Sequence, residues 1–94
     1  MRRRNRRRIQ YNFEDIYFKP QGIPLSSLEE TVLSTEELET LRLRYLKGLA
    51  QDEAAYQMGI SQSQYQRDIT KALKKITEAL IEGKAINIQK RKEN

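Results

Sequence analysis

The segment Asp52–Ile69, DEAAYQMGISQSQYQRDI, constrains the fold of this 94-residue chain more than any other part of the sequence. Two stretches with helical spacing of apolar residues flank Gly59-Ile60-Ser61. Glycine readily adopts the left-handed conformation that ends a helix, and serine is a good N-cap for the next one. The segment therefore predicts a helix over Gln51–Met58, a short turn with Ile60 pointing into the core, and a second helix that begins at Gln62.

The second helix is expected to run from Gln62 to Glu82, because nothing breaks it before Gly83. Its apolar residues recur every three or four positions, as on the buried face of a helix: Tyr65, Ile69, Ala72, Leu73, Ile76 and Leu80. Leu73, Ile76, Leu80 and Ile81 extend beyond what a minimal three-helix unit must cover. We expect them to be core against the helix that starts at Glu36; the alternative is a seam between two copies in a homodimer.

The outward face of this helix starts without acidic side chains. Asp68 is the first acid after Ser61, whereas ordinary surface helices use Glu and Lys for solubility. Glutamine can pair with adenine and arginine with guanine through two hydrogen bonds each. The pattern is typical of a helix-turn-helix, whose second helix enters the DNA major groove, although an ordinary helical hairpin is the alternative. The predicted base-reading residues are Gln62, Ser63, Gln64, Gln66, Arg67 and Thr70.

The region before this segment predicts two further helices. Leu25, Leu28 and Val32 have the spacing of a short first helix. Ser34 and Glu37 have capping-box spacing, so a second helix is expected from there to about Lys47, where Gly48 ends it. The buried residues expected on this second helix are Leu38, Leu41 and Tyr45.

The remaining segments have weaker signals. Lys19–Pro24 reads as a turn-rich connector, and Ala85–Ile88 as a short strand. We expect the aromatic residues near the start of the chain to pack on the helical unit or to pair with Ala85–Ile88; these are Tyr11, Phe13, Tyr17 and Phe18. The predicted fold is mostly α, a helix-turn-helix bundle with a long last helix and short β segments near both ends. Its expected parts are a disordered arm (1–8), an extended segment (9–24), the helix-turn-helix domain (25–88) and a charged tail (89–94).

Charge is distributed unevenly along the chain. The first 13 residues hold six arginines and no acid, residues 14–55 hold nine acidic and four basic side chains, and the rest is basic again. Basic ends favour a polyanionic partner, here double-stranded DNA. The arginine arm either adds non-specific attraction or lies in the minor groove or along phosphates, and RNA is a third possible partner. The predicted phosphate contacts are Arg2, Arg3, Arg4, Arg6, Arg7, Arg8, Lys71, Lys74 and Lys75.

Composition argues against several other functions. The chain has no histidine and no cysteine, which removes the commonest general base and the commonest ligands of zinc. We therefore expect no enzymatic activity, no metal site and no cofactor. No apolar run is long enough to span a membrane, and the arginine-rich start does not resemble a secretory signal, so we expect a cytoplasmic protein.

Three stretches carry a family resemblance: YFKPQGIPLSSLEE, LETLRLRYLKGLAQDEAAYQMGIS and EALIEGKAINI. They resemble a family of small prokaryotic proteins of uncharacterised function, predicted to bind DNA and related to the helix-turn-helix of sigma-factor region four. The resemblance covers roughly Arg8–Ile88 and implies that the last helix reads bases. The positions it implies for base contact are Gln62, Ser63, Gln66 and Arg67.

The chain also departs from that family. Family members often carry cysteine in or after the basic arm, Ala50 replaces the usual polar N-cap, and Tyr65 stands where a smaller apolar residue or Phe is usual. The function expected from all these observations is sequence-specific DNA binding by a transcriptional regulator. The rival is a sigma-type interaction module that contacts RNA polymerase or another protein, with the acidic region from Glu29 to Glu39 as its contact surface.

Overall fold

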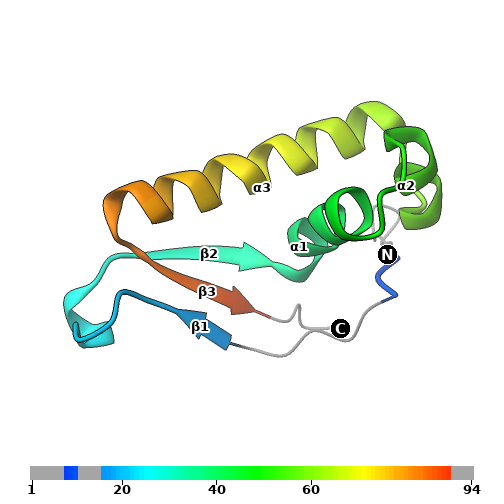
Figure 1. The fold of residues 1–94 in the computed structure, drawn as a ribbon. Helices are drawn as coiled ribbons and strands as arrows, with labels where there is room; N and C mark the ends of the chain where they lie inside the picture. The colour runs from blue at the N-terminus through cyan, green and yellow to red at the C-terminus, as the bar shows by residue number, and fades with distance from the viewer. Residues whose placement is uncertain (1–7, 11–15, 90–94) are drawn as a thin grey trace, which may run out of the picture.

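A long helix, α3, organises the computed structural model, which describes residues 8–10 and 16–89 (Figure 1). One end of α3 packs against two short helices, and the other end lies over a small sheet. The chain is mostly helical with β segments near both ends, as the sequence predicts. The elements are β1 (Ile16–Phe18), β2 (Glu30–Ser34), α1 (Thr35–Leu41), α2 (Gln51–Met58), α3 (Gln62–Glu82) and β3 (Ala85–Gln89).

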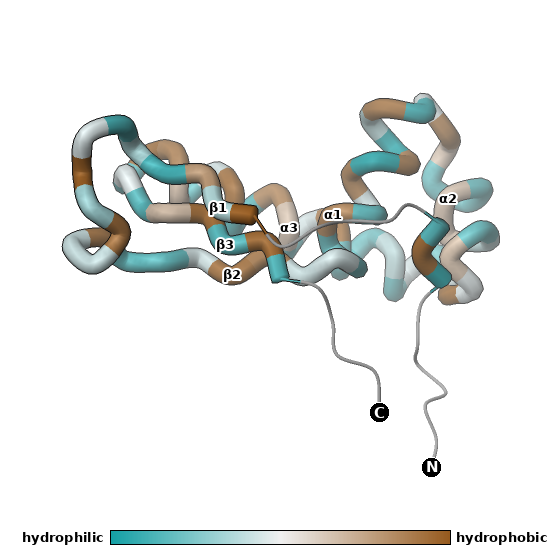
Figure 2. Tube along the Cα trace, turned by 90° about the horizontal axis from the view of Figure 1, so that it is seen from below, coloured by the Kyte–Doolittle hydropathy of each residue, from teal (hydrophilic) through white to brown (hydrophobic). Residues whose placement is uncertain are grey.

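The sheet has three strands in the order β1-β3-β2. β1 pairs antiparallel with β3, with Tyr17 opposite Asn87, and β2 pairs parallel with β3, with Leu33 opposite Ile88. The predicted strand at Ala85–Ile88 and the pairing of Tyr17 and Phe18 with it are confirmed. Figure 2, seen from below, shows the strands in front of α3, so the helix covers one face of the sheet.

The predicted helix around Leu25, Leu28 and Val32 is wrong. Only a single 3₁₀ turn, Leu25–Ser27, forms there, and the chain then enters β2. Leu33 is the buried residue of this strand, while Val32 is 44% exposed. The local spacing fitted a helix, but parallel pairing with β3, more than fifty residues away, decided the conformation.

The helix that begins after Ser34 has the predicted capping box. The Ser34 hydroxyl accepts from the Glu37 amide at 3.1 Å, and the Glu37 carboxylate accepts from the Ser34 amide at 3.1 Å. After α1 the chain continues as a π-helical turn over Arg42–Leu46, and Gly48 follows in the left-handed region. The prediction that Tyr45 is buried is wrong, because the wider turn directs Leu43 inward and leaves Tyr45 63% exposed.

The helices and the sheet enclose two apolar clusters that share α3. The first joins α2 and the π-helical turn to the start of α3, and consists of Leu43, Ala54, Ala55, Met58, Tyr65 and Ile69, with Ile60 packed against it as predicted. The second joins α3 to the sheet through Leu33, Ala72 and Ile88. Tyr65, Ile69 and Ala72 therefore face inward, as predicted, and Ile76 packs against the second cluster.

The last residues of the predicted buried face of α3 are not buried in the structure. Leu80 and Ile81 are 72% and 80% exposed and Leu73 is 40% exposed, so the prediction that these three residues are core against α1 is wrong. Ala79 is buried in their place. Beyond Ala72 the support under α3 is the sheet, and a small side chain at the contact lets helix and strands approach closely.

Several predictions concern residues outside 8–10 and 16–89, the residues that the structure describes. These residues are most of the arginine arm, Tyr11, Phe13 and most of the charged tail.

Lys19–Pro24 is a turn region, as predicted. Within the described part of the chain, no helix combines the length and the apolar character needed to cross a bilayer.

Candidate nucleic-acid interface

The turn between α2 and α3 fixes where α3 begins. Gly59 has a φ of 73° and ends α2, and the Ser61 hydroxyl accepts a hydrogen bond from the Gln64 amide at 3.0 Å. At the other end of α2, Ala50 has no side-chain acceptor, but the Glu53 carboxylate accepts from the Ala50 amide at 3.4 Å. Both glycine and serine thus take the roles that the sequence predicts.

Tyr65 anchors the first turns of α3 to the rest of the protein. Its ring is fully buried in the first cluster, and its hydroxyl donates to the Thr40 carbonyl oxygen at 2.5 Å. Burial raises the pKa of Tyr65 to about 12, so the hydroxyl keeps its proton and remains a donor. Phenylalanine would fill the same space without satisfying Thr40, which gives the unusual tyrosine a structural role.

The opposite side of the same turns faces solvent. Gln62, Ser63, Gln66, Arg67 and Thr70 are all exposed, whereas Gln64 is half-buried at the edge of this face. We call these five exposed residues the polar face of α3. Together with Gln51 at the start of α2, four of them line an open depression, namely Gln62, Ser63, Gln66 and Arg67. The sequence did not single out Gln51, because only the fold brings the start of α2 beside α3.

Side-chain hydrogen bonds link residues of this face to each other and to Gln64 at its edge. The Arg67 guanidinium donates to the side-chain Oε1 of Gln64 at 2.9 Å, and the side-chain Nε2 of Gln64 donates to the Asp68 carboxylate at 2.7 Å. Gln66 donates to the Thr70 hydroxyl at 3.1 Å. These bonds hold long side chains in defined positions, which lowers the entropy cost of binding a partner. They also place the single acid of these turns in contact with an amide donor.

The predicted phosphate contacts divide into two groups. Lys71 and Lys74 are exposed on α3. Lys75 is half-buried; its ammonium donates to the Val32 carbonyl oxygen at 2.9 Å and to the Glu37 carboxylate at 3.0 Å. Lys75 therefore serves the contact between α3, α1 and β2.

Arg8 marks where the basic arm meets the fold. Its amide donates to the Met58 carbonyl oxygen at 3.0 Å, and its guanidinium donates to the Tyr56 carbonyl oxygen at 3.4 Å. The guanidinium also lies against Gly59, where an added Cβ would come within 2.7 Å of it. The arm thus joins the fold at the turn that precedes α3, while Arg2, Arg3, Arg4, Arg6 and Arg7 lie outside the described residues.

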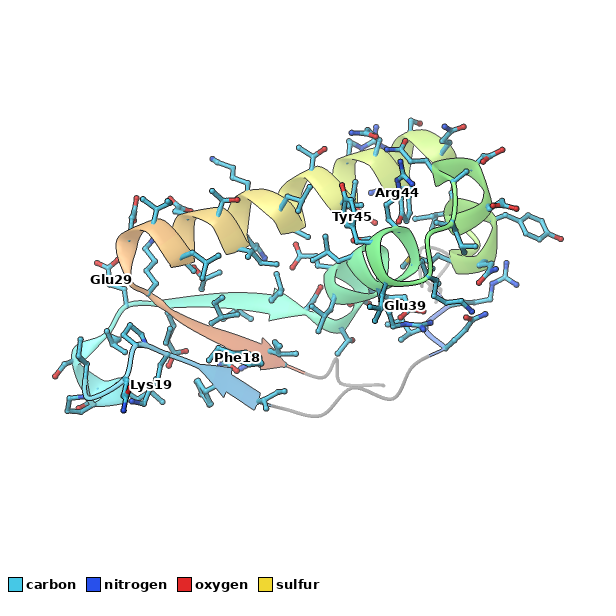
Figure 3. The ribbon with its side chains drawn as sticks, viewed as in Figure 1. Phe18, Lys19, Glu29, Glu39, Arg44 and Tyr45 are labelled. Atoms are coloured by element: carbon cyan, nitrogen blue, oxygen red, sulfur yellow. The ribbon has the colours of Figure 1, made fainter. Side chains whose placement is uncertain are left out.

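The acidic region that sequence reasoning offered as a contact surface is largely internal. Glu36, Glu37 and Glu39 are all buried. Glu39 accepts two hydrogen bonds from Arg42, at 2.9 and 3.0 Å, and a third from the Gln10 amide at 3.2 Å (Figure 3). The expectation that Glu29 to Glu39 form a contact surface is therefore wrong for these three carboxylates, because they are buried, and Glu37 and Glu39 accept internal hydrogen bonds.

The loop that leads into α2 is fixed by a second arginine. Arg44 donates to the Leu49 carbonyl oxygen at 2.9 Å, and its guanidinium lies 5.9 Å from the centre of the Tyr45 ring (Figure 3).

Residues 8–10 and 16–89 contain no group of three or more His, Cys, Asp or Glu side chains able to hold a metal ion.

Comparison with known proteins places the chain among uncharacterised proteins of bacteria and archaea. Residues 1–93 match the family described as "Protein of unknown function DUF134". The chain belongs to this family. It is 47% identical over 83 residues to a UPF0251 protein of Desulforudis audaxviator, a match that covers 88% of this chain and 54% of the relative.

Two other relatives agree with this assignment. A UPF0251 protein of Caldanaerobacter subterraneus subsp. tengcongensis is 53% identical over 73 residues, which are 78% of this chain and 62% of that protein. A UPF0251 protein of Methanocella arvoryzae is 49% identical over 88 residues, which are 94% of this chain and 53% of that protein. The chain thus spans between half and two-thirds of the length of these relatives. No solved structure matches the chain significantly.

Proposed function

We propose that the protein binds double-stranded DNA sequence-specifically and acts as a transcriptional regulator. In this proposal α2, the Gly59-Ile60-Ser61 turn and α3 form a helix-turn-helix of the sigma region-four type. The first turns of α3 enter the major groove, as the second helix of such motifs does. The polar face of α3 supplies the side chains that contact base edges.

The observation that carries the proposal is the composition and exposure of the polar face. Gln62, Ser63, Gln66, Arg67 and Thr70 are exposed over two turns and include no acid that would repel phosphate. Glutamine and arginine can each make paired hydrogen bonds to a single base, so the face has the chemistry needed to tell base pairs apart. The depression beside Gln51 adds one further amide at the same place.

The support beneath this face suits a reading helix. Tyr65 and Ile69 hold α3 from the inside, and the Tyr65 hydroxyl bonds to α1, so the backbone under the polar face is fixed. Base readout requires side chains to be placed to within a fraction of an ångström, and rigid elements provide that placement.

Phosphate contacts are assigned to exposed cations around the face. Lys71 lies next to the polar face on α3, and Arg8 brings the arginine arm to the turn before α3. Such contacts position a protein on DNA without reading sequence, and they make binding weaker as salt increases. Lys75 is left out of this set, because Glu37 already binds its ammonium.

The proposal is tested by fluorescence anisotropy with duplex DNA and two charge-matched variants. Arg67→Glu reverses a charge on the polar face, while Lys19→Glu makes the same charge change in the loop at the far end of the molecule (Figure 3). Arg67→Glu is expected to weaken binding by at least about tenfold, because a carboxylate would face phosphate and base acceptors. Lys19→Glu is expected to change it by less than about threefold.

Equal effects of the two variants, or no duplex binding by the wild-type protein, would reject the proposal. In the second case, a pull-down with RNA polymerase would test the rival function, an interaction module without base readout.

A further inference from the structure

The outward side of α3 changes character half-way along the helix. Up to Thr70 it carries glutamine, serine, threonine and arginine. Beyond Lys74 its exposed residues include the large apolar side chains Leu80 and Ile81, beside Thr77, Glu78 and Glu82. Leu80 and Ile81 are 72% and 80% exposed, and Leu73 is 40% exposed. Large apolar side chains grouped on one helix face are unfavourable in water, and such groups mark interaction surfaces.

The apolar side chains lie on the flank of α3 away from β2. Lys75 identifies the β2 flank, because its ammonium binds the Val32 carbonyl oxygen. At 100° per residue, Leu73 and Leu80 lie on the opposite flank, toward β1. There β1 exposes Ile16 and Phe18, which pair with Ile88 and Ile86 and so point to the same side of the sheet as they do. The helix and the edge strand thus contribute to one apolar side of the molecule.

We propose that this apolar side binds a second copy of the chain, with the two α3 helices antiparallel about a twofold axis near Thr77. A twofold interface must be self-complementary. Leu73 and Leu80 are seven residues apart, which is two helical turns, so antiparallel α3 helices place each Leu73 against Leu80 of the partner subunit. Thr77, small and uncharged, lies between them where the two helices cross.

The charges beside the apolar side chains also fit a second copy. Lys74 and Glu78 lie along one edge of this face, four residues apart. In the same antiparallel arrangement Lys74 lies beside Glu78 of the partner subunit, and Glu78 lies beside the partner's Lys74. Opposite charges thus meet on both sides of the axis. The face itself carries no charge at Leu73, Thr77, Leu80 or Ile81, so it does not suit a polyanion.

Single-cysteine variants test the geometry directly, because the chain has no cysteine of its own. Thr77→Cys places a thiol beside the proposed axis, whereas Tyr56→Cys places one at an 81% exposed position on α2. Mild oxidation is expected to give a disulfide-linked dimer from Thr77→Cys and to leave Tyr56→Cys mostly monomeric. Equal yields from the two variants, or none from Thr77→Cys, would overturn the proposed arrangement.

Analytical ultracentrifugation over a concentration series measures the dimer dissociation constant. It compares substitutions at two exposed leucines, one on the proposed interface and one away from it. Leu80→Glu is expected to raise the dimer dissociation constant by at least about tenfold, because it would bury an unpaired charge. Leu46→Glu, at an 82% exposed leucine after α1, should leave it unchanged. Lys74→Glu and Glu78→Lys should each weaken the dimer, and the double variant should restore it.

A wild-type protein that is monomeric at every concentration, or a dimer insensitive to Leu80→Glu, would overturn the inference. Neither result depends on DNA, so the dimer and the proposed function fail or stand separately. Circular dichroism of each variant checks that its helices remain folded.

Discussion

The two halves of α3 belong to one continuous helix but rest on different supports. The first half packs against α1, α2 and the π-helical turn, where its tyrosine hydroxyl bonds to a backbone carbonyl. The second half lies on strands, with the small residues Ala72 and Ala79 at the contact. Outward, the first half is polar, and the second exposes Leu80 and Ile81 beside Glu78. The comparison shows how one helix can carry two surfaces: an apolar cluster with one buried hydrogen bond holds a hydrogen-bonding face, and close packing on a sheet leaves neighbouring apolar side chains uncovered.

The largest expected effect is on the free energy of unfolding, which should fall much more for a substitution in the first half of α3 than for one in the second half. Tyr65→Ala should lower the free energy of unfolding by about 3–5 kcal/mol, because it opens a cavity in the first cluster. Leu80→Ala, 15 positions further along the same helix, should change it by less than about 0.5 kcal/mol at concentrations where the protein is monomeric. Urea unfolding followed by circular dichroism measures both values. Similar losses from the two variants would contradict the division of α3 into a buried anchor and an exposed flank.

The next effect concerns a buried carboxylate of α1, the helix that packs against α3. Glu39→Ala should cost about 3 kcal/mol, because it leaves Arg42 without the buried carboxylate that accepts two of its hydrogen bonds. Glu29→Ala removes a carboxylate that is 83% exposed and 3.8 Å from Lys84, and should cost less than about 1 kcal/mol. Both are measured by urea unfolding. A Glu39→Ala variant as stable as Glu29→Ala would show that the buried acid does not support the fold.

The contribution of the Tyr65 hydroxyl to stability can be separated from that of its ring by the pH dependence of unfolding. Tyr65→Phe should cost about 1–2 kcal/mol near neutral pH, since the Thr40 carbonyl loses its donor. Burial raises the pKa of Tyr65 to about 12, above its value in the unfolded chain, so the folded state holds this proton more tightly. The wild type should therefore lose this stability as pH rises from about 10 to about 12. The difference from Tyr65→Phe should shrink over that range, and a constant difference would refute the buried hydrogen bond.

The smallest effects concern the caps of the two helices that meet at the turn. Ser61→Ala should cost about 1 kcal/mol, because the Gln64 amide loses its acceptor. Ala50→Ser should instead stabilise the protein by about 0.5–1 kcal/mol, because it adds the acceptor that α2 lacks. Thermal unfolding of the two variants tests the pair. Shifts of the same sign would mean that capping does not set the ends of α2 and α3.

Sequence patterns spanning only a few residues were sufficient to predict the helical part of the molecule. The capping box of Ser34 and Glu37, the turn at Gly59 and Ser61, and the span of α3 all depend on neighbours within a few residues, and all were predicted. The inward positions of Tyr65 and Ile69 followed from periodicity for the same reason. The exposure of Gln62, Ser63, Gln66 and Arg67 then follows from the inward anchors.

Features that depend on distant contacts were missed or misread. β2 forms by pairing with β3, so Val32 looked helical in isolation. The π-helical turn moved Leu43 inward and Tyr45 outward, and periodicity assumes a regular helix. Burial of Glu39 depends on Arg42 and Gln10, and a charged side chain gives no local sign of such an environment. The role of Gln51 likewise required the positions of both helices.

Selection of duplexes from a random pool, followed by affinity measurements, tests most directly whether the polar face of α3 reads DNA. The wild-type protein should enrich a defined sequence. Arg67→Ala should lose about 1–3 kcal/mol on that sequence, with relaxed preference at one base pair, while its binding to random duplex stays nearly unchanged. Failure to enrich any sequence, or an equal loss on selected and random duplexes, would contradict base readout by α3.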